Sequence, residues 1–135
     1  MPQLRHMSTS YGSMVGMPKA LPVLDMSTPV CCAPVAAGPL DDAAALEIAL
    51  RLKALADPVR VKLVSLLFGS ETGEECSSEL AAAVELSEST VSHHLSQLRR
   101  AGLVESERRG MNMYHRPRRD SLVALCSVLD PNCCT

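Results

Sequence analysis

The sequence is poor in aromatic residues: among its 135 residues there is no Trp, one Phe and two Tyr. The core of a single domain of this length must therefore be aliphatic, and 47% of the residues are hydrophobic, mainly Leu, Val and Ala. The sequence also lacks any apolar run of about 18 residues or more, which argues against a membrane span. The first thirty residues lack the continuous apolar segment of a signal peptide, so we expect a cytoplasmic protein.

Charge is unevenly distributed along the chain. The formal net charge is only -2, yet seven of the thirteen basic residues fall in one stretch near the C-terminal end. They are Arg99, Arg100, Arg108, Arg109, Arg116, Arg118 and Arg119. Such local clustering predicts an anionic partner better than the net charge does.

The six cysteines include no Cys-x-x-Cys pair, and no βαβ pattern surrounds any of them. These absences argue against a thiol reductase, and we expect no enzymatic activity. In a reducing compartment structural disulfides are not expected, so the cysteines indicate metal binding or redox chemistry.

The chain divides into three parts by composition. Residues 1–39 carry the vicinal pair Cys31–Cys32 and prolines at 18, 22, 29, 34 and 39, and no helical period is sustained there, which predicts a flexible N-terminal arm. Residues 40–130 are predicted to fold as one domain, and residues 131–135 as a C-terminal tail.

The pattern within residues 40–130 predicts five helices and one hairpin. Helices are expected at about 41–55, at 58–68 with Asp57 as N-cap and Pro58 at the first position, and at 77–84. A further helix begins after Ser87 and ends at Gly102, and the last covers about 119–129. Alternation over 103–117 predicts two strands joined near Gly110. The expected fold class is mainly α with a small β-hairpin.

Two of these helices have the spacing of a helix-turn-helix. Val91, Leu95 and Leu98 form an apolar stripe on the second helix, and short polar side chains lie opposite near its N-terminal end. Such groups meet base edges when a helix enters a major groove, and a basic hairpin is suited to phosphates or a minor groove. A solvated helix surface would also be Ser-rich, but the turn, the spacing and the hairpin together favour double-stranded DNA. The predicted DNA contacts are Ser89, Thr90, Ser92, His93, Gln97, Arg99, Arg108 and Arg109.

Three segments together resemble the ArsR/SmtB family of winged-helix metal-sensing repressors: "LKALADPVRVKLVSLL", "LSESTVSHHLSQLRRAGLV" and "ERRGMNMYHR". The resemblance covers about residues 41–129. It implies a winged helix-turn-helix homodimer, joined through residues 41–55 and 119–129, that binds a palindromic operator and releases it when a soft metal or metalloid ion binds. One departure is Glu85, where the family often has Gly in the turn.

The metal-sensing sites of this family match the chain only in part. The zinc site on the last helix is absent, because "RDSLVALCSVLD" supplies Asp120 but no His. The arsenic and cadmium site uses a Cys-x-Cys pair before the first helix of the helix-turn-helix; here Cys76 is present, but Ser78 stands at the second position.

Cys31 and Cys32 on the arm complete a set of three thiols with Cys76, the number that a trigonal As(III) or Sb(III) site needs. Some arsenic sensors of the family resemble this combination. The predicted function is therefore an As(III)- or Sb(III)-responsive repressor with Cys31, Cys32 and Cys76 as ligands.

Alternatives remain at this point. Cys126, Cys133 and Cys134 form a second candidate thiol set, although Cys126 lies in an apolar stripe. The same fold and thiols also suit a Cd(II)- or Pb(II)-responsive repressor, or a repressor whose vicinal thiols respond to oxidation.

Overall fold

The computed structural model describes residues 25–31 and 34–130. Its elements in chain order are a 3₁₀ turn, η1 (Val35–Ala37), the helices α2 (Asp42–Leu55) and α3 (Pro58–Phe68), strand β1 (Glu75–Cys76), α4 (Ser77–Val84), α5 (Glu88–Arg100), β2 (Val104–Arg109), β3 (Asn112–Pro117) and α6 (Arg119–Leu129). Among these residues, none of the helices combines the length and apolar character that crossing a membrane requires.

The helix boundaries follow from local side-chain chemistry, as predicted. The Asp41 carboxylate accepts a hydrogen bond from the backbone N–H of Ala44 at 2.8 Å and caps α2. Asp57 caps α3 in the same way ahead of Pro58, and Ser87 caps α5. Gly102 has a positive φ of 74° just past α5, the backbone conformation that ends many helices.

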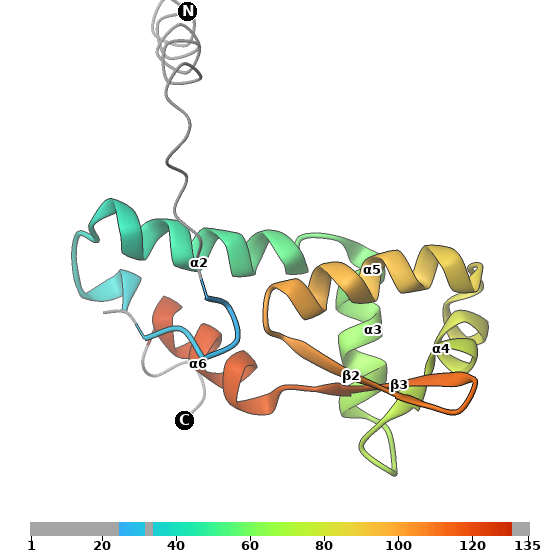
Figure 1. Ribbon diagram of the computed structural model, residues 1–135. Coiled ribbons are helices and arrows are strands. Elements are labelled where there is room, and N and C mark those ends of the chain that lie inside the picture. The colour runs from blue at the N-terminus through green and yellow to red at the C-terminus, as the bar shows by residue number, and fades with distance from the viewer. Residues whose placement is uncertain (1–24, 32–33, 131–135) are drawn as a thin grey trace, which may run out of the picture.

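The core is aliphatic, as the composition predicts. Leucines from α3, α4 and α5 and from the start of β2 meet in it with almost no exposed surface: Leu63, Leu67, Leu80, Leu95, Leu98 and Leu103. Helix α3 runs behind α5 and packs against both α4 and α5, whereas α2 and α6 lie together at the other end of the molecule (Figure 1). The helix-turn-helix and the hairpin thus share one continuous core.

The sheet has a third strand that the sequence did not predict. The order is β1-β3-β2, with both pairings antiparallel, so β3 is the central strand. Cys76 is paired with Tyr114 and Glu75 with His115. Two residues carry no readable alternation, which is why the segment before α4 was expected to be only a loop.

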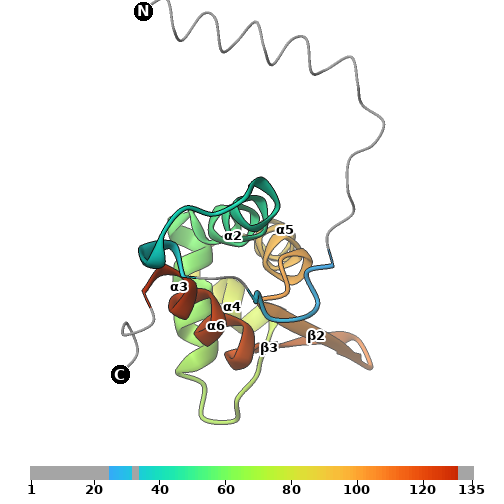
Figure 2. The ribbon, with the colours of Figure 1, turned by 90° about the vertical axis from the view of Figure 1, so that its left-hand side faces the viewer.

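Part of the predicted flexible arm is packed on the domain. Val30 is 6% exposed within the core cluster, and Met26 packs against the same cluster. The described arm residues run between α2 and α6 (Figures 1 and 2). Met26 and Val30 of the predicted arm therefore contact the core of the domain.

Glu85, in the turn between α4 and α5, is the one non-glycine residue with positive φ in the described chain. Its φ of 59° and ψ of 44° are left-handed helical values, which cost an L-residue about 1–2 kcal/mol. The expected turn geometry is thus kept, but with strain that Gly would avoid.

Replacing Glu85 with Gly is expected to raise the free energy of unfolding by up to about 1 kcal/mol, because relief of strain exceeds the added freedom of the unfolded chain. Urea unfolding followed by circular dichroism measures this. Ala82→Gly, inside α4, is the matched control and is expected to destabilise by roughly 0.5–1 kcal/mol. Equal destabilisation by both substitutions would contradict the assignment.

Candidate nucleic-acid interface and thiol site

The solvent-facing side of α5 is made of short polar groups. Val91, Leu95 and Leu98 are buried on the inner side. The predicted DNA contacts on the outer side are exposed, namely Ser89, Thr90, Ser92, His93 and Arg99, whereas Gln97 is half-buried. The N-terminal half of α5 can therefore approach another surface without displacing any core side chain.

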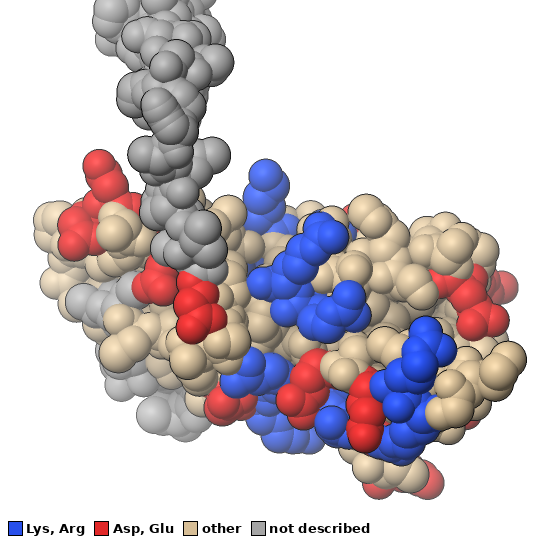
Figure 3. All heavy atoms as spheres, in the orientation of Figure 1, with Lys and Arg blue, Asp and Glu red and all other residues tan. Residues whose placement is uncertain are grey.

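The β2–β3 hairpin forms a wing beside α5. Arg108 is exposed and lines, with Ser92 of α5 and Met111 of the turn, a small groove between the helix and the wing. Basic side chains gather over the end of α5 and along the wing, with acidic side chains between them on the wing (Figure 3). The wing is thus mixed in charge rather than uniformly basic.

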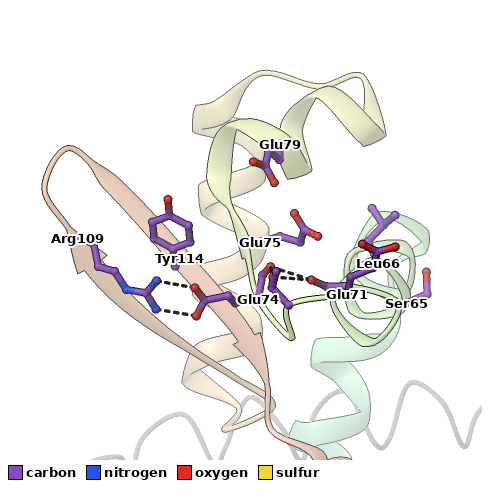
Figure 4. A pocket seen from close by; sticks show the side chains of 11 residues that line it. Ser65, Leu66, Glu71, Glu74, Glu75, Glu79, Arg109 and Tyr114 are labelled. Carbon is purple, nitrogen blue, oxygen red and sulfur yellow. Dashed lines mark hydrogen bonds and ion pairs between the residues drawn. The ribbon is translucent and has the colours of Figure 1, made fainter.

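Arg109, which the sequence predicts as a DNA contact, is engaged within the protein. Its guanidinium donates to both carboxylate oxygens of Glu74, at 2.5 and 2.6 Å, and to Glu107 at 3.0 Å (Figure 4). It also lies 4.5 Å from the centre of the Tyr114 ring. These hydrogen bonds raise the pKa of Arg109 and, from the other side, lower the pKa of Glu74. The guanidinium is therefore already paired with a carboxylate from the loop between α3 and β1.

Cys76 is a buried thiol at the junction between the sheet and the helix-turn-helix. It is the N-cap residue of α4 and the last residue of β1, and its Sγ lies 3.2 Å from the Ser78 hydroxyl. Glu75 and Glu79 lie beside it in an open groove of about 710 Å³ between the wing and α3 (Figure 4). A hydrogen bond between these two carboxyl groups, together with their mutual repulsion, raises the pKa of Glu79. Any ion bound by Cys76 would lie next to acidic groups.

Of the three predicted ligand thiols, the structure describes two. Cys31 is exposed and precedes η1, which packs on α6, whereas Cys76 is buried at the start of α4. In the part of the chain that the structure describes, no group of three or more metal-binding side chains is assembled. Cys32, Cys133 and Cys134 lie outside the described residues.

Cys126 takes part in a disulfide. This differs from the expectation that the chain has no disulfides. The expectation was based on a reducing compartment. The redox state of a compartment does not determine whether two cysteines lie close enough to form a disulfide. In this form Cys126 has no thiolate to offer to a metal.

His115 connects the wing to the start of α4. It is 3% exposed, with its Nε2 2.8 Å from the Ser77 hydroxyl and its Nδ1 2.7 Å from the Ser106 hydroxyl. Burial, and then the charge of Arg99, lowers the pKa of His115 to about 4. At neutral pH the imidazole is therefore uncharged and joins three elements: β3, β2 and α4. The sequence offered no signal for this role, because it depends on three distant segments.

The four largest exposed apolar side chains of α2 and α6 are Leu46, Leu50, Val123 and Leu129. Both helices are at the end of the domain opposite α4, as Figure 1 shows. Exposed apolar groups that form a contiguous patch mark surfaces that another protein covers. The residues agree with the segments for which the sequence predicts dimer contacts.

The buried His115 makes stability depend on pH. Between its unfolded pKa of 6.5 and its folded pKa of about 4, the unfolded chain binds a proton that the folded chain does not. The free energy of unfolding is therefore expected to fall as pH falls from 6.5 to 4, by at most about 3 kcal/mol.

Urea unfolding at pH 7 and pH 4.5 tests this prediction, with His115→Gln as the comparison because Gln keeps hydrogen-bonding groups and does not titrate. The difference between the two pH values is expected to be smaller in the variant. The same pH dependence in both proteins would show that other groups cause it.

Comparisons with known proteins agree with this architecture. Residues 57–106 match the family described as bacterial regulatory protein, arsR family. The arsenic resistance transcriptional regulator ArsR1 of Pseudomonas putida is 42% identical over 47% of this chain and 48% of its own length. The biofilm growth-associated repressor of Agrobacterium fabrum is 34% identical over 63% of this chain and 70% of its own length. The chain spans about half the length of the first of these curated relatives.

A solved structure shares the fold. The homodimeric winged helix-turn-helix DNA-binding domain of a possible ArsR-family regulator from Mycobacterium bovis is 33% identical and covers 67% of this chain and 84% of its own, with a TM-score of 0.54. Together with the sequence matches, it shows that the chain belongs to the ArsR family of winged helix-turn-helix regulators.

Proposed function

We propose that the protein is a transcriptional repressor that binds operator DNA as a homodimer and dissociates when As(III) or Sb(III) binds to its cysteine thiolates. The observation that carries the proposal is the position of Cys76. Cys76 is the N-cap residue of the first helix of the helix-turn-helix and, as part of β1, its backbone is paired directly with the wing. A ligand at Cys76 therefore acts on both parts that would meet DNA.

The exposed face of α5 supports the DNA-binding part of the proposal. The side chains of Ser92 and His93 are free of the core, and the basic residues at the end of α5 and on the wing suit phosphates. Much of the affinity would come from these arginines and would fall steeply with salt. Base contacts would come from the short polar groups in the first turns of α5.

The exposed leucines and valine of α2 and α6 support a homodimer. The solved Mycobacterium bovis domain is described as homodimeric. Association through α2 and α6 would leave both copies of α5 uncovered, as binding to two half-sites of a palindrome requires.

The inducer site would be shared between subunits. Cys31 and Cys32 of one protomer would bind the metalloid together with Cys76 of the partner subunit, because Cys31 precedes η1, which packs on α6, whereas Cys76 begins α4, which packs on α3, α5 and the sheet. Three thiolates are the donor set that soft trivalent arsenic and antimony prefer. Ser78 has a hydroxyl where the family's cadmium site has a second thiol, which favours a three-coordinate ion.

A redox-responsive repressor is the second candidate, and the disulfide at Cys126 favours it. Oxidation would then fix α6, a helix that we place in the dimer contact, and change the distance between the two copies of α5. Release would follow an oxidant rather than arsenite.

Replacing Cys31, Cys32 or Cys76 with Ser is expected to raise the arsenite concentration needed for operator release at least about tenfold, because each variant loses one of three ligands. Operator affinity without arsenite is expected to stay unchanged. Fluorescence anisotropy of labelled operator DNA under reducing conditions measures both quantities, with Cys126→Ser as the matched control.

The result separates the candidates. Normal release from all three variants would refute the thiol assignment, and release by Cd(II) or Pb(II) at lower concentrations than arsenite would change the inducer. Release by peroxide in the native chain, lost in Cys126→Ser, would support the redox-responsive repressor instead.

Glu74→Gln is expected to increase operator affinity and steepen its salt dependence by about one unit of slope, because it frees Arg109 for a phosphate. Anisotropy titrations at several salt concentrations measure the slope. Glu105→Gln is the control, since Glu105 binds Arg116 but not Arg109. An unchanged slope in Glu74→Gln would mean that Arg109 does not reach DNA.

A further inference from the structure

The arm carries a short segment, residues 26–30, whose backbone carbonyl groups accept hydrogen bonds from the domain. We refer to this segment as the strap. The carbonyl oxygen of Thr28 accepts a hydrogen bond at 3.0 Å from Nη2 of Arg51. Arg51 belongs to α2 and is only 1% exposed. Its other contacts are the carbonyl of Glu47 at 3.1 Å and the Glu47 carboxylate at 3.7 Å.

A buried guanidinium is costly unless its N–H groups are satisfied. Glu47 lies one turn earlier on the same helix and satisfies only one side of the Arg51 fork. The strap supplies the acceptor on the other side. The buried guanidinium of Arg51 therefore depends on the strap for a hydrogen-bond acceptor. Neither Arg51 nor the strap belongs to the DNA-binding face.

The two preceding carbonyls of the strap are held by other elements. The Ser27 carbonyl accepts a hydrogen bond from Nη1 of Arg118, which lies between β3 and α6. The Met26 carbonyl lies directly over Gly102, so that a Cβ at Gly102 would overlap its oxygen. Successive carbonyls thus contact the base of the wing and the end of α5.

These anchor points are linked to one another. The backbone N–H of Arg118 donates to the carbonyl of Leu103 at 2.8 Å, which ties the start of α6 to the residue after Gly102. Val30 is buried at the other end of the strap, and Met26 is half-buried. The strap is therefore held on the domain by apolar side chains as well as by its carbonyl groups. Cys31 follows Val30 immediately and is exposed.

We propose that Arg51 and Arg118 are positioning residues: they dock the strap so that metalloid capture at the adjoining Cys31 moves the end of α5 and weakens operator binding. This inference rests on the proposed function and adds the path by which the arm acts. A loose arm would bind the ion without moving α5. A docked strap transmits the movement, because its carbonyl groups are bound by the side chains of Arg51 in α2 and of Arg118 between β3 and α6, and lie against Gly102 just past α5.

The test uses the full-length chain with Arg118→Ala and Arg51→Lys. Arsenite binding is followed by the absorbance of the sulfur–arsenic bonds, and operator affinity is measured with and without arsenite. Both variants are expected to bind arsenite with the stoichiometry of the unchanged chain, while the ratio of the two operator affinities falls at least about fivefold. Arg118→Lys is expected to recover part of the ratio.

Arg119→Ala is the matched control. Arg119 adjoins Arg118 but stacks over Phe68, with 4.6 Å to the ring centre. In Arg119→Ala the ratio of the operator affinities measured without and with arsenite is expected to equal that of the unchanged chain. Because the ratio compares each variant with itself, any direct contact of Arg118 with DNA cancels.

A second measurement does not depend on arsenite. Hydrogen exchange of the amides of residues 99–103 is expected to quicken in Arg118→Ala without any ligand, because the strap no longer covers the end of α5. Unchanged exchange, or unchanged affinity ratios in Arg118→Ala and Arg51→Lys, would overturn the inference. Failure of the unchanged chain to bind arsenite or release DNA would refute the proposed function instead.

Discussion

Strand β3 pairs with β2 over the full length of the wing and with both residues of β1, and this central position decides where the other parts of the site lie. Through β1 it places Cys76 at the start of α4. Through His115 it contacts Ser77 of α4, and through Tyr114 it supports Arg109. The wing and the first helix of the helix-turn-helix are thus parts of one hydrogen-bonded unit and do not move independently.

The helices were predictable from sequence because their determinants are local. Asp41, Asp57 and Ser87 are caps whose partners lie two or three residues away, and the apolar stripe of α5 has a period that sequence alone displays. Strand β1 was missed for the opposite reason. Its only determinant is pairing with β3, about forty residues later, and two residues are too few to show a period.

The elements that carry the candidate site were predicted, but not the contacts that join them. The polar face of α5 and the thiol of Cys76 are where the sequence placed them. The engagement of Arg109 by Glu74, the docking of the arm and the disulfide of Cys126 were not foreseen. Each of these contacts joins residues that are distant in sequence. An arginine or a cysteine can pair with many partners, and its residue type does not reveal which one.

Tyr114 has an optical consequence. The chain contains no Trp, and Tyr114 is one of its two tyrosines, so a large share of its ultraviolet emission originates in the wing. The ring lies beneath the Arg109 guanidinium and in register with the thiol-bearing residue of β1. Emission from a phenol in that environment is sensitive to neighbouring charge and to heavy atoms. The protein therefore contains a native fluorophore at the junction where sulfur chemistry and the wing meet.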